Sequence, residues 1–403
     1  MPFILATVVI DMVAIGLIIP ALPFLVAQFA DTPARQAYAL GLVSFAFGIA
    51  NFFGAPILGA LSDRYGRRPV LLIGFSGLAL SFFVTAVAQS LWMLVVVRLF
   101  SGAMQANAAV AQAYVADITP PEERARRFGL LGAAFGMGFI LGPVMGGVLG
   151  AIQLQLPFYV AGVLALLNWL YGFFVLPESL PADRRKPFDW KRANPVAAFQ
   201  GLTRLEGVRP LVAIVALSGL AQLVLHTSWV LYTSFKFGWG PKENGWSLFA
   251  VGVASVVVQG WLLKHLLQRF AHEKLAVMGL VSSSLAFFAW AVATEGWMMY
   301  AVIALNLLGF AVANVVQSMI SQAADARSQG QTMGSVASLN SLMAVAAPVI
   351  GSALLGLGST HTQDGQRWLV GLPFYFCAAL QAASAVIAYR FFRHRSGLAA
   401  GQA

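Results

Sequence analysis

The sequence predicts an all-α integral membrane protein with twelve transmembrane helices arranged as two six-helix pseudo-repeats. Its 403 residues are 59% hydrophobic and only 10% charged, with a mean hydropathy of +0.78. A soluble domain averages about 25% charged residues. The apolar residues occur in continuous runs of roughly 20, the length of a helix that crosses a bilayer, and do not alternate as barrel strands do. Composition and pattern therefore exclude a soluble fold and favour helical spans.

Twelve apolar segments fit between the polar loops. The predicted spans are 3–29, 37–61, 70–88, 92–115, 126–150, 156–176, 211–235, 246–263, 275–293, 297–320, 330–357 and 368–390. We expect the first to be a retained helix, because no basic n-region or small-residue cleavage site marks a signal peptide.

The chain divides at its only sizeable polar linker, a basic, proline-bearing stretch. We predict an N-terminal bundle over 1–176, a cytoplasmic linker over 177–210, and a C-terminal bundle with a short tail over 211–403. The halves also echo each other, since Gly142-Pro143-Val-Met-Gly146 recurs as Ala347-Pro348-Val-Ile-Gly351. Repeated halves of this kind place a substrate site at mid-membrane between them.

Basic residues set the expected orientation. The formal net charge is +10, and with the N-terminus inside, 20 of the 25 lysines and arginines fall on the cytoplasmic side. This is the distribution that the positive-inside rule describes, so both termini are expected in the cytoplasm. The basic charge orients the protein and requires no nucleic-acid partner.

Three ionisable side chains lie clearly inside predicted spans: Asp11, Arg98 and His226. Such groups are costly in hydrocarbon and are functional hypotheses by default. Asp11 and Arg98 enter from opposite sides, and at 1.5 Å per residue their backbones differ by roughly 9 Å in depth. We predict that Asp11 carries a proton and that Arg98 is its electrostatic partner. The alternatives are a structural hydrogen bond for Asp11, a carbonyl clamp for Arg98, and packing, substrate contact or a second protonation site for His226.

Polar and aromatic residues scattered through the spans are candidates for lining a substrate cavity, and each polar one has interhelical hydrogen bonding as its alternative. The substrate-binding candidates are Phe47, Asn51, Gln105, Asn107, Phe135, Gln222, His226, Trp229, Tyr232, Asn314 and Asn340. The sequence contains no Walker loop, zinc-ligand cluster or G-x-S-x-G motif. We therefore expect no enzyme activity, no metal site and no cofactor, with a proton gradient as the energy source.

A dense group of charges separates the second and third spans, in Gly59-Ala-Leu-Ser-Asp63-Arg64-Tyr-Gly66-Arg67-Arg68-Pro69. Gly59 lies four residues before Asp63, on the same helix face, and is expected to let another backbone approach closely. Asp63 can pair with arginines at the membrane surface, and Gly66 permits a tight turn. The gating candidates here are Gly59, Asp63, Arg64, Gly66, Arg67 and Arg68.

The fifth predicted span carries glycines at four-residue spacing, which suits a close helix–helix contact, and a proline that opens a bend. Its candidates for a moving interface are Gly138, Gly142, Pro143, Gly146 and Gly147.

The 59–69 segment resembles the signature of the major facilitator superfamily. Asp11 with Gly16-Leu-Ile-Ile-Pro20 resembles the first-helix signature of twelve-helix drug/proton antiporters, and Arg98-Leu-Phe-Ser-Gly102 resembles their fourth-helix motif. Gly138 to Gly147 resembles their fifth-helix antiporter motif. Ala116-Asp117-Ile-Thr-Pro and Trp229-Val-Leu-Tyr-Thr are similar to the bacterial tetracycline-resistance branch.

This resemblance implies proton-coupled export of a lipophilic or amphipathic small molecule, such as a tetracycline-like drug, by alternating access across a bacterial inner membrane. Asp63, Arg67 and Arg68 would latch the cytoplasmic side, and we expect a monomer. The chain departs from the branch at Ser81, at Ser283 or Ser284, and near Ser255, where tetracycline antiporters carry two carboxylates and a histidine. Uptake or facilitated diffusion of a metabolite, movement of a lipid, and a non-transporting membrane sensor are the alternatives.

Overall fold

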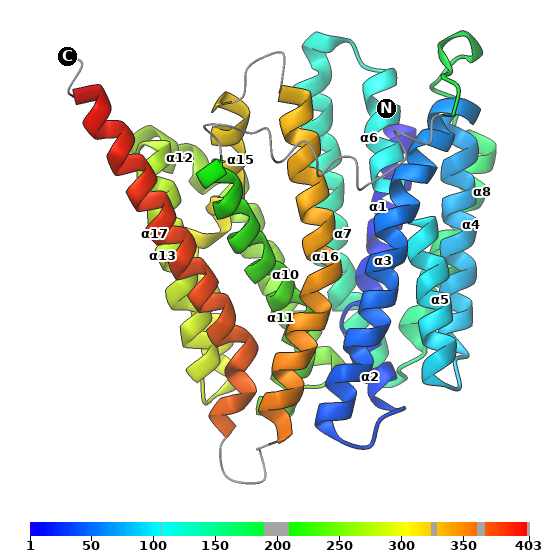
Figure 1. Cartoon of the computed structure of the whole chain (residues 1–403). Coiled ribbons are helices and arrows are strands. Elements are labelled where there is room, and N and C mark those ends of the chain that lie inside the picture. Colours follow the sequence, from blue (N-terminus) through cyan, green and yellow to red (C-terminus); the bar gives the residue numbers. More distant parts are fainter. Residues whose placement is uncertain (106, 189–208, 324–328, 361–366, 401–403) are drawn as a thin grey trace. The chain divides into compact units, whose positions relative to one another are not determined.

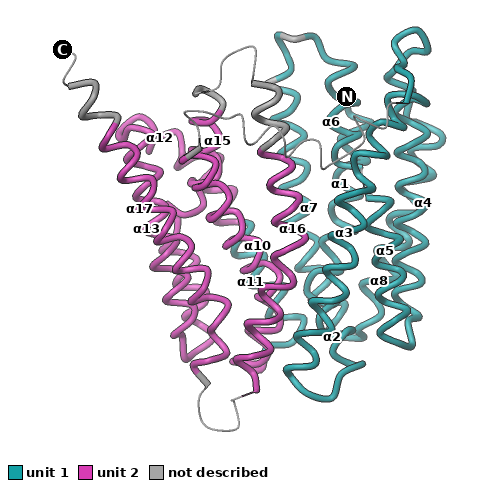
Figure 2. Tube along the Cα trace, viewed as in Figure 1, with its two compact units in different colours: residues 1–197, 239–252 teal, residues 198–238, 253–403 magenta. Residues whose placement is uncertain are grey.

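The computed structural model describes residues 1–105, 107–188, 209–323, 329–360 and 367–400. It divides into two compact units (Figure 2). The N-terminal unit comprises Met1–Ala197 together with Trp239–Gly252, and the C-terminal unit comprises Ala198–Gly238 together with Val253–Ala403. Every regular element in the described residues is a helix (Figure 1).

The N-terminal unit contains eight α-helices in chain order, besides the part of α11 that belongs to it. They are α1 (Pro2–Ile18), α2 (Leu22–Ala27), α3 (Pro33–Tyr65), α4 (Arg67–Ala86), α5 (Leu91–Met104), α6 (Asn107–Asp117), α7 (Arg124–Ile152) and α8 (Leu156–Val175). Two single 3₁₀ turns, η1 (Pro121–Glu123) and η2 (Ala182–Arg184), lie in its loops.

The C-terminal unit begins with a long helix and contains two irregular stretches within its spans. Its elements are α10 (Arg209–Phe237), α11 (Pro241–Val257, shared with the other unit), the π-helical η4 (Val258–Leu262), α12 (Leu263–Arg269), α13 (His272–Val292), α14 (Gly296–Leu305), the 3₁₀ turn η5 (Gly309–Ala311), α15 (Val312–Ala323), α16 (Gln329–Thr360), the 3₁₀ turn η7 (Arg367–Gly371) and α17 (Leu372–Ala400).

The described residues include eleven helical segments long and apolar enough to cross a membrane. A twelfth span is obtained if Gly296–Leu305 and Gly309–Ile320, which meet at 59°, count as one. The predicted class, an all-helical multi-pass membrane protein, is therefore confirmed.

Several helices extend beyond the predicted span ends, because local capping and not hydropathy decides where a helix stops. The second span, predicted over 37–61, is α3 over Pro33–Tyr65. Thr32 caps its start by accepting a hydrogen bond from the backbone N–H of Arg35 at 3.3 Å. Gly66 ends it with a φ of +107°, a conformation that favours glycine.

Two spans that the sequence treats as continuous are broken. The fourth span breaks between α5 and α6, where the Asn51 side-chain amide donates to the carbonyls of Gly102 at 3.4 Å and Gln105 at 2.7 Å. The tenth breaks between α14 and α15, and there Ser282 donates to Asn306 Oδ1 at 3.0 Å. Backbone carbonyls freed inside a membrane must find partners such as the Asn51 amide, whereas the contact of Ser282 joins two side chains. Broken helices of this kind commonly mark the binding sites of transporters.

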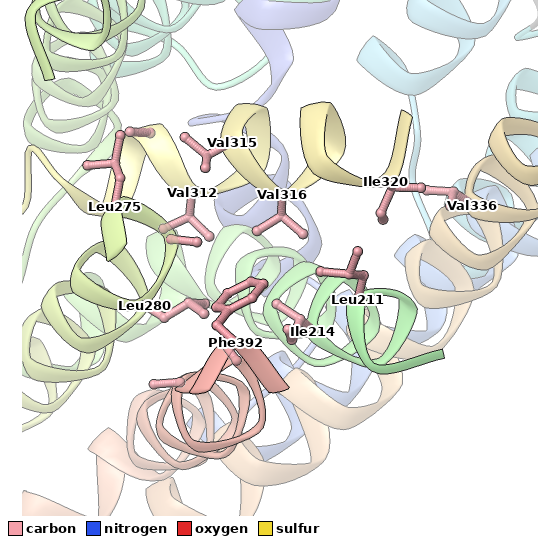
Figure 3. Packing of buried hydrophobic residues seen from close by; sticks show 14 of the residues in the cluster. Leu211, Ile214, Leu275, Leu280, Val312, Val315, Val316, Ile320, Val336 and Phe392 are labelled. Carbon is pink, nitrogen blue, oxygen red and sulfur yellow. The ribbon is translucent and has the colours of Figure 1, made fainter. Parts of the chain in front are cut away.

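Each unit has its own apolar core. In the N-terminal unit α1 packs on α7 and α8, and buried residues such as Ile4, Leu71 and Leu131 form one cluster. In the C-terminal unit Leu211 and Ile214 of α10 meet residues of α13, α15 and α17 (Figure 3). Outside these cores, the broken helices are the irregular parts of each unit.

Glycines of α7 lie against the backbone of α1. A Cβ on Gly142 would lie 2.6 Å from the Cα of Gly16, and one on Gly146 would overlap the carbonyl of Leu17. Gly147 faces another partner, since its Cβ would lie 2.9 Å from the Cα of Gly245. Small residues therefore set the distance between these helices.

Candidate functional site

Asp11 lies at the centre of the N-terminal unit's intramembrane site. Its side chain is only 3% exposed, and the amide of Asn107 donates to its two carboxylate oxygens at 3.3 and 3.5 Å. Asn107 is the first residue of α6, directly after the break in the fourth span. A space of about 10 Å³ beside the carboxylate is lined by apolar side chains that include Phe75 and Phe135. The site is thus a buried carboxylate whose neutral amide partner lies at the start of α6, beside the break in the fourth span.

Arg98 does not pair with Asp11. Within the described residues its guanidinium lies over the ring of Phe47, 5.8 Å from the centroid, and its buried Nε has no hydrogen-bond partner. No ion pair joins the two predicted partners in the part of the chain that the structure describes. The reason is the direction of each side chain: α5 packs on α3, which carries Phe47, whereas Asp11 is held toward α6. The alternative carbonyl clamp is likewise not formed among the described residues.

The loop between α3 and α4 forms a charge network around Arg67, which is 8% exposed. Its guanidinium pairs with Asp63 Oδ1 at 2.6 Å and with Asp117 Oδ2 at 3.0 Å, and it donates to Ser62 Oγ at 2.6 Å. The predicted pairing of Asp63 with an arginine is present. Asp117, at the end of α6, is a partner that the sequence analysis did not assign.

Glu178, which follows the sixth span, also belongs to this network. Its carboxylate accepts from the backbone N–H groups of Arg67 at 2.8 Å and Arg68 at 3.2 Å, at the start of α4. The Lys186 N–H donates to the carbonyl of Asp63 at 3.0 Å. The described start of the predicted linker thus folds onto the loop, while 189–208 lies outside the described residues. In the sequence, the only indication of the contact between Glu178 and the start of α4 was the Pro177-Glu178-Ser179 segment directly after the sixth span.

The remaining candidates of this loop have different surroundings. Arg64 lies over the ring of Tyr65 at 5.0 Å, and Arg68 donates to the carbonyl of Phe173. Within the described residues of the N-terminal unit, no atom lies within 4 Å of a Cβ built on Gly59. The close approach of another backbone expected at Gly59 stays a prediction.

A cavity of about 360 Å³ lies inside the C-terminal unit, beside the break in the tenth span. Gly309 and Phe310 at the break form part of its wall. Its polar lining residues are Ser218, Gln222, His226, Ser283, Gln317, Asn340 and Gln381. Four of these carry carboxamides, and none carries a carboxylate, lysine or arginine. The cavity therefore offers neutral hydrogen-bonding groups on an apolar wall, the usual make-up of a small-molecule site.

Gln381 is the most informative of these residues. It is 1% exposed, and its Oε1 has no hydrogen-bond partner within the described chain. A buried, unpaired amide costs about 1–3 kcal/mol, so its retention calls for a ligand or water that completes it. Gln222, His226 and Asn340 were predicted from the sequence, but Gln381 was not, because nothing in the order of residues shows which amides face a void.

The other predicted binding residues lie elsewhere. Trp229 and Tyr232 are buried in an aromatic cluster, in which Trp229 lies 5.2 Å from Trp290 and Tyr232 lies 4.1 Å from Phe374 between ring centroids. Tyr232 also donates to the carbonyl of Trp290. Asn314 is exposed on α15 and is not part of the cavity wall. In this conformation these three residues pack or face outward, and their binding role stays a prediction.

Serines occupy the positions at which the chain differs from the tetracycline-resistance branch, and their hydroxyl groups have the following surroundings. Ser81 donates to the carbonyl of Leu78 at 2.8 Å, Ser284 donates to that of Ala378 at 2.8 Å, and Ser283 lines the cavity. Ser255 accepts from the amide of Gln259 at 2.7 Å. Of these four serines only Ser283 lines the cavity, and the described lining residues include no acidic group.

Broken helices beside polar groups, in a multi-pass helical protein built from two units, are the features of secondary transporters. The sequence model of the Major Facilitator Superfamily matches residues 4–348 and 211–402, and the chain belongs to this family. It is therefore a membrane transporter of that superfamily, and the prediction that it is not an enzyme is confirmed.

The chain is similar to proteins named for tetracycline resistance. It is 37% identical over 372 residues to the class C tetracycline resistance protein of Escherichia coli, covering 92% of this chain and 93% of the relative. It is 34% identical over 379 residues to the class D protein of Salmonella ordonez, covering 93% and 94%. Among solved structures, nucleoside transporter NupG matches with a TM-score of 0.76 at 14% identity, covering 97% of this chain and 99% of NupG. That last likeness shows the fold alone.

Proposed function

We propose that this protein is a proton-coupled antiporter that exports a lipophilic or amphipathic small molecule from the cytoplasm. The observation that carries the proposal is Asp11, a carboxylate buried in a span and held by one amide at the edge of a broken helix. Intramembrane carboxylates are costly and are typical of proton relays. The names of the relatives, tetracycline resistance proteins, support export of a drug-like compound.

In the proposed cycle Asp11 exchanges its proton with one side of the membrane at a time. Asn107 directly follows the break between α5 and α6, so any rearrangement at the break moves the amide that donates to Asp11. Such a movement changes the polarity around the carboxylate and with it the preference for the charged form. Arg98, which is buried without an anion, is the nearby cation expected to stabilise the ionised state after that movement.

We assign substrate contacts to the amide-lined cavity of the C-terminal unit. Its carboxamides and hydroxyls can pair with donors and acceptors of the ligand, while Phe310 and neighbouring aliphatic side chains cover its apolar part. Since the described residues of the wall include no carboxylate, a neutral or singly charged compound fits better than a metal complex of high charge. A tetracycline-like molecule in its metal-free form is within this class.

The network around Arg67 is proposed as the latch of the cytoplasmic side in the outward-open state. Asp63, Asp117 and Glu178 bring three chain segments to Arg67 and the start of α4. We place the protein in the inner membrane as a monomer with both termini in the cytoplasm, and with two bundles joined by the 177–210 linker. Opening toward the cytoplasm would require these ion pairs to separate.

The test is proton release by purified protein at fixed pH when tetracycline and a panel of other lipophilic drugs are added. Competition between drug and proton predicts release from the wild type and none from Asp11→Asn. Asp31→Asn is the matched control, because Asp31 is an exposed carboxylate that pairs only with Arg35 at 3.4 Å. A compound that binds without proton release from the wild type would contradict the coupling and would favour a facilitator of metabolites or lipids.

A further inference from the structure

A groove of about 780 Å³ runs along the surface of the C-terminal unit between α13 and α17. Its lining residues are Val277, Val281, Ala385, Val386, Tyr389, Arg390, Arg393 and His394. The opposite faces of both helices are buried in the unit's core cluster, through residues such as Leu280 and Phe392 (Figure 3). The groove therefore lies on the outward side of this helix pair, where a membrane protein meets lipid.

The groove changes from apolar to cationic along α17. Tyr389 and Arg390 lie three and four residues after Val386, and Arg393 and His394 lie three and four residues after Arg390, so the five share one helix face. The predicted span ends at 390, so Arg390 and Arg393 are expected at the level of the lipid headgroups, with Tyr389 at the interface beside them. The cationic stretch and the apolar stretch together extend for about 12 Å along the helix.

The two arginines and the histidine have no protein partner within the described residues. Neither Arg390, Arg393 nor His394 forms an ion pair or hydrogen bond there, although all three are exposed. The wall that faces them from α13 is supplied by Val277 and Val281. Exposed arginines that pair with no acid among the described residues are available to an anion in the membrane.

The α13 wall continues away from the cations as an apolar stripe. Val281, Leu285 and Phe288 lie at spacings of four and three residues and are 44%, 65% and 51% exposed. In a membrane-spanning helix this exposed stripe faces hydrocarbon. A ligand with a negative head and a long apolar tail would match the whole groove.

We propose that the groove between α13 and α17 is a binding site for an anionic phospholipid. Its phosphate lies between Arg390, Arg393 and His394, and an acyl chain lies along Val386, Val281 and Leu285. Basic pockets between membrane helices bind anionic headgroups in this way, and the arginine fork matches phosphate geometry.

The test is lipid retention by the purified full-length protein, measured by native mass spectrometry with phosphatidylglycerol or phosphatidylcholine added. The wild type is expected to retain phosphatidylglycerol preferentially. Each of Arg390→Gln and Arg393→Gln is expected to weaken that retention about five-fold, and the double variant to remove the preference. Arg126→Gln is the matched control, because Arg126 is an exposed arginine at the start of α7, outside the groove.

A second variant separates lipid binding from folding. Val281→Trp fills the apolar part of the groove from an exposed position and keeps both arginines, so it is expected to weaken phosphatidylglycerol retention without lowering the unfolding temperature of lipid-free protein. Equal retention of the two lipids by the wild type, or unchanged preference in Arg390→Gln/Arg393→Gln, would overturn the proposal.

Discussion

Both units contain a broken helix, but different groups gather at the two breaks. At the break between α5 and α6 the N-terminal unit places the buried carboxylate of Asp11 and the amide of Asn107. At the break between α14 and α15 the C-terminal unit places a cavity of about 360 Å³ lined by uncharged polar side chains. A helix break therefore lies beside a titratable group in one unit and beside a cavity with an uncharged polar lining in the other.

The repeated helices sharpen this contrast. Gly146 of α7 meets Leu17 of α1, and its repeat counterpart Gly351 of α16 meets Ser228 of α10. Asp11 lies six residues before Leu17 in α1, and Gln222 lies six residues before Ser228 in α10. One position carries a titratable carboxyl group and the other an amide that lines the cavity. We infer that proton coupling is concentrated in the N-terminal unit and ligand contact in the C-terminal unit.

The largest effect is expected from substituting the residues at these two matched positions, one at a time. Asp11→Asn should reduce proton-driven transport in inverted vesicles to background, because the amide cannot carry the proton. Gln222→Leu should raise KM for the drug while the ratio of protons to substrate stays that of the wild type. Transport by both variants is measured from the drug-dependent change in fluorescence of a dye that reports the proton gradient. Equal loss of coupling in the two variants would remove the contrast between the units.

A smaller but clear effect is expected at the matched glycines. Gly146→Ala should lower the free energy of unfolding by about 2–3 kcal/mol, because the new methyl group overlaps the α1 backbone, which cannot move aside. At Gly351 the nearest atoms are the side-chain oxygens of Ser228 at 2.6 Å and Thr227 at 3.1 Å. These can rotate, so Gly351→Ala should cost under about 1 kcal/mol. Thermal unfolding of the purified variants in detergent tests the difference, and a Gly351→Ala that is the more destabilising would contradict it.

Gln381→Leu should weaken drug binding about ten-fold by removing an amide that pairs with the ligand. The same change should leave stability unchanged or slightly higher, since Oε1 of this amide has no partner among the described residues. Tryptophan fluorescence titration and thermal unfolding measure the two effects. Gln259→Leu is the control, because Gln259 lies outside the cavity and bonds to Ser255. A Gln381→Leu that binds like the wild type would exclude Gln381 from the site.

The smallest effect concerns the two loops that precede the third and ninth spans. Glu178→Gln should cost about 1–2 kcal/mol, because a charged acceptor for the backbone N–H groups of Arg67 and Arg68 is lost. Glu273, in the corresponding loop of the C-terminal unit, is exposed at the start of α13, and Glu273→Gln should change stability by less than about 0.5 kcal/mol. Urea unfolding of both variants tests this difference, and similar losses would show that the network around Arg67 is not special.

Much of this protein was determined by its sequence alone. Hydropathy fixes the number of spans, since each run of apolar residues has a single low-energy environment in a bilayer. Short-range geometry is equally readable: Asp63 and Arg67 are four residues apart and pair at 2.6 Å, and Gly66 takes the positive φ that ends α3. These features depend on residues close in the chain, so their order is sufficient.

Only the tertiary structure decided which distant groups meet. Asp11 is bonded to Asn107 and not to Arg98, because α5 packs its arginine toward Phe47 of α3. The breaks in the fourth and tenth spans depend on partners such as Asn51 and Ser282 from neighbouring helices. A cavity is a property of packing, so the role of Gln381 could not be read from its surroundings in the sequence. Periodicity assigns a face to each helix, but the energies of burial and hydrogen bonding between helices choose what that face contacts.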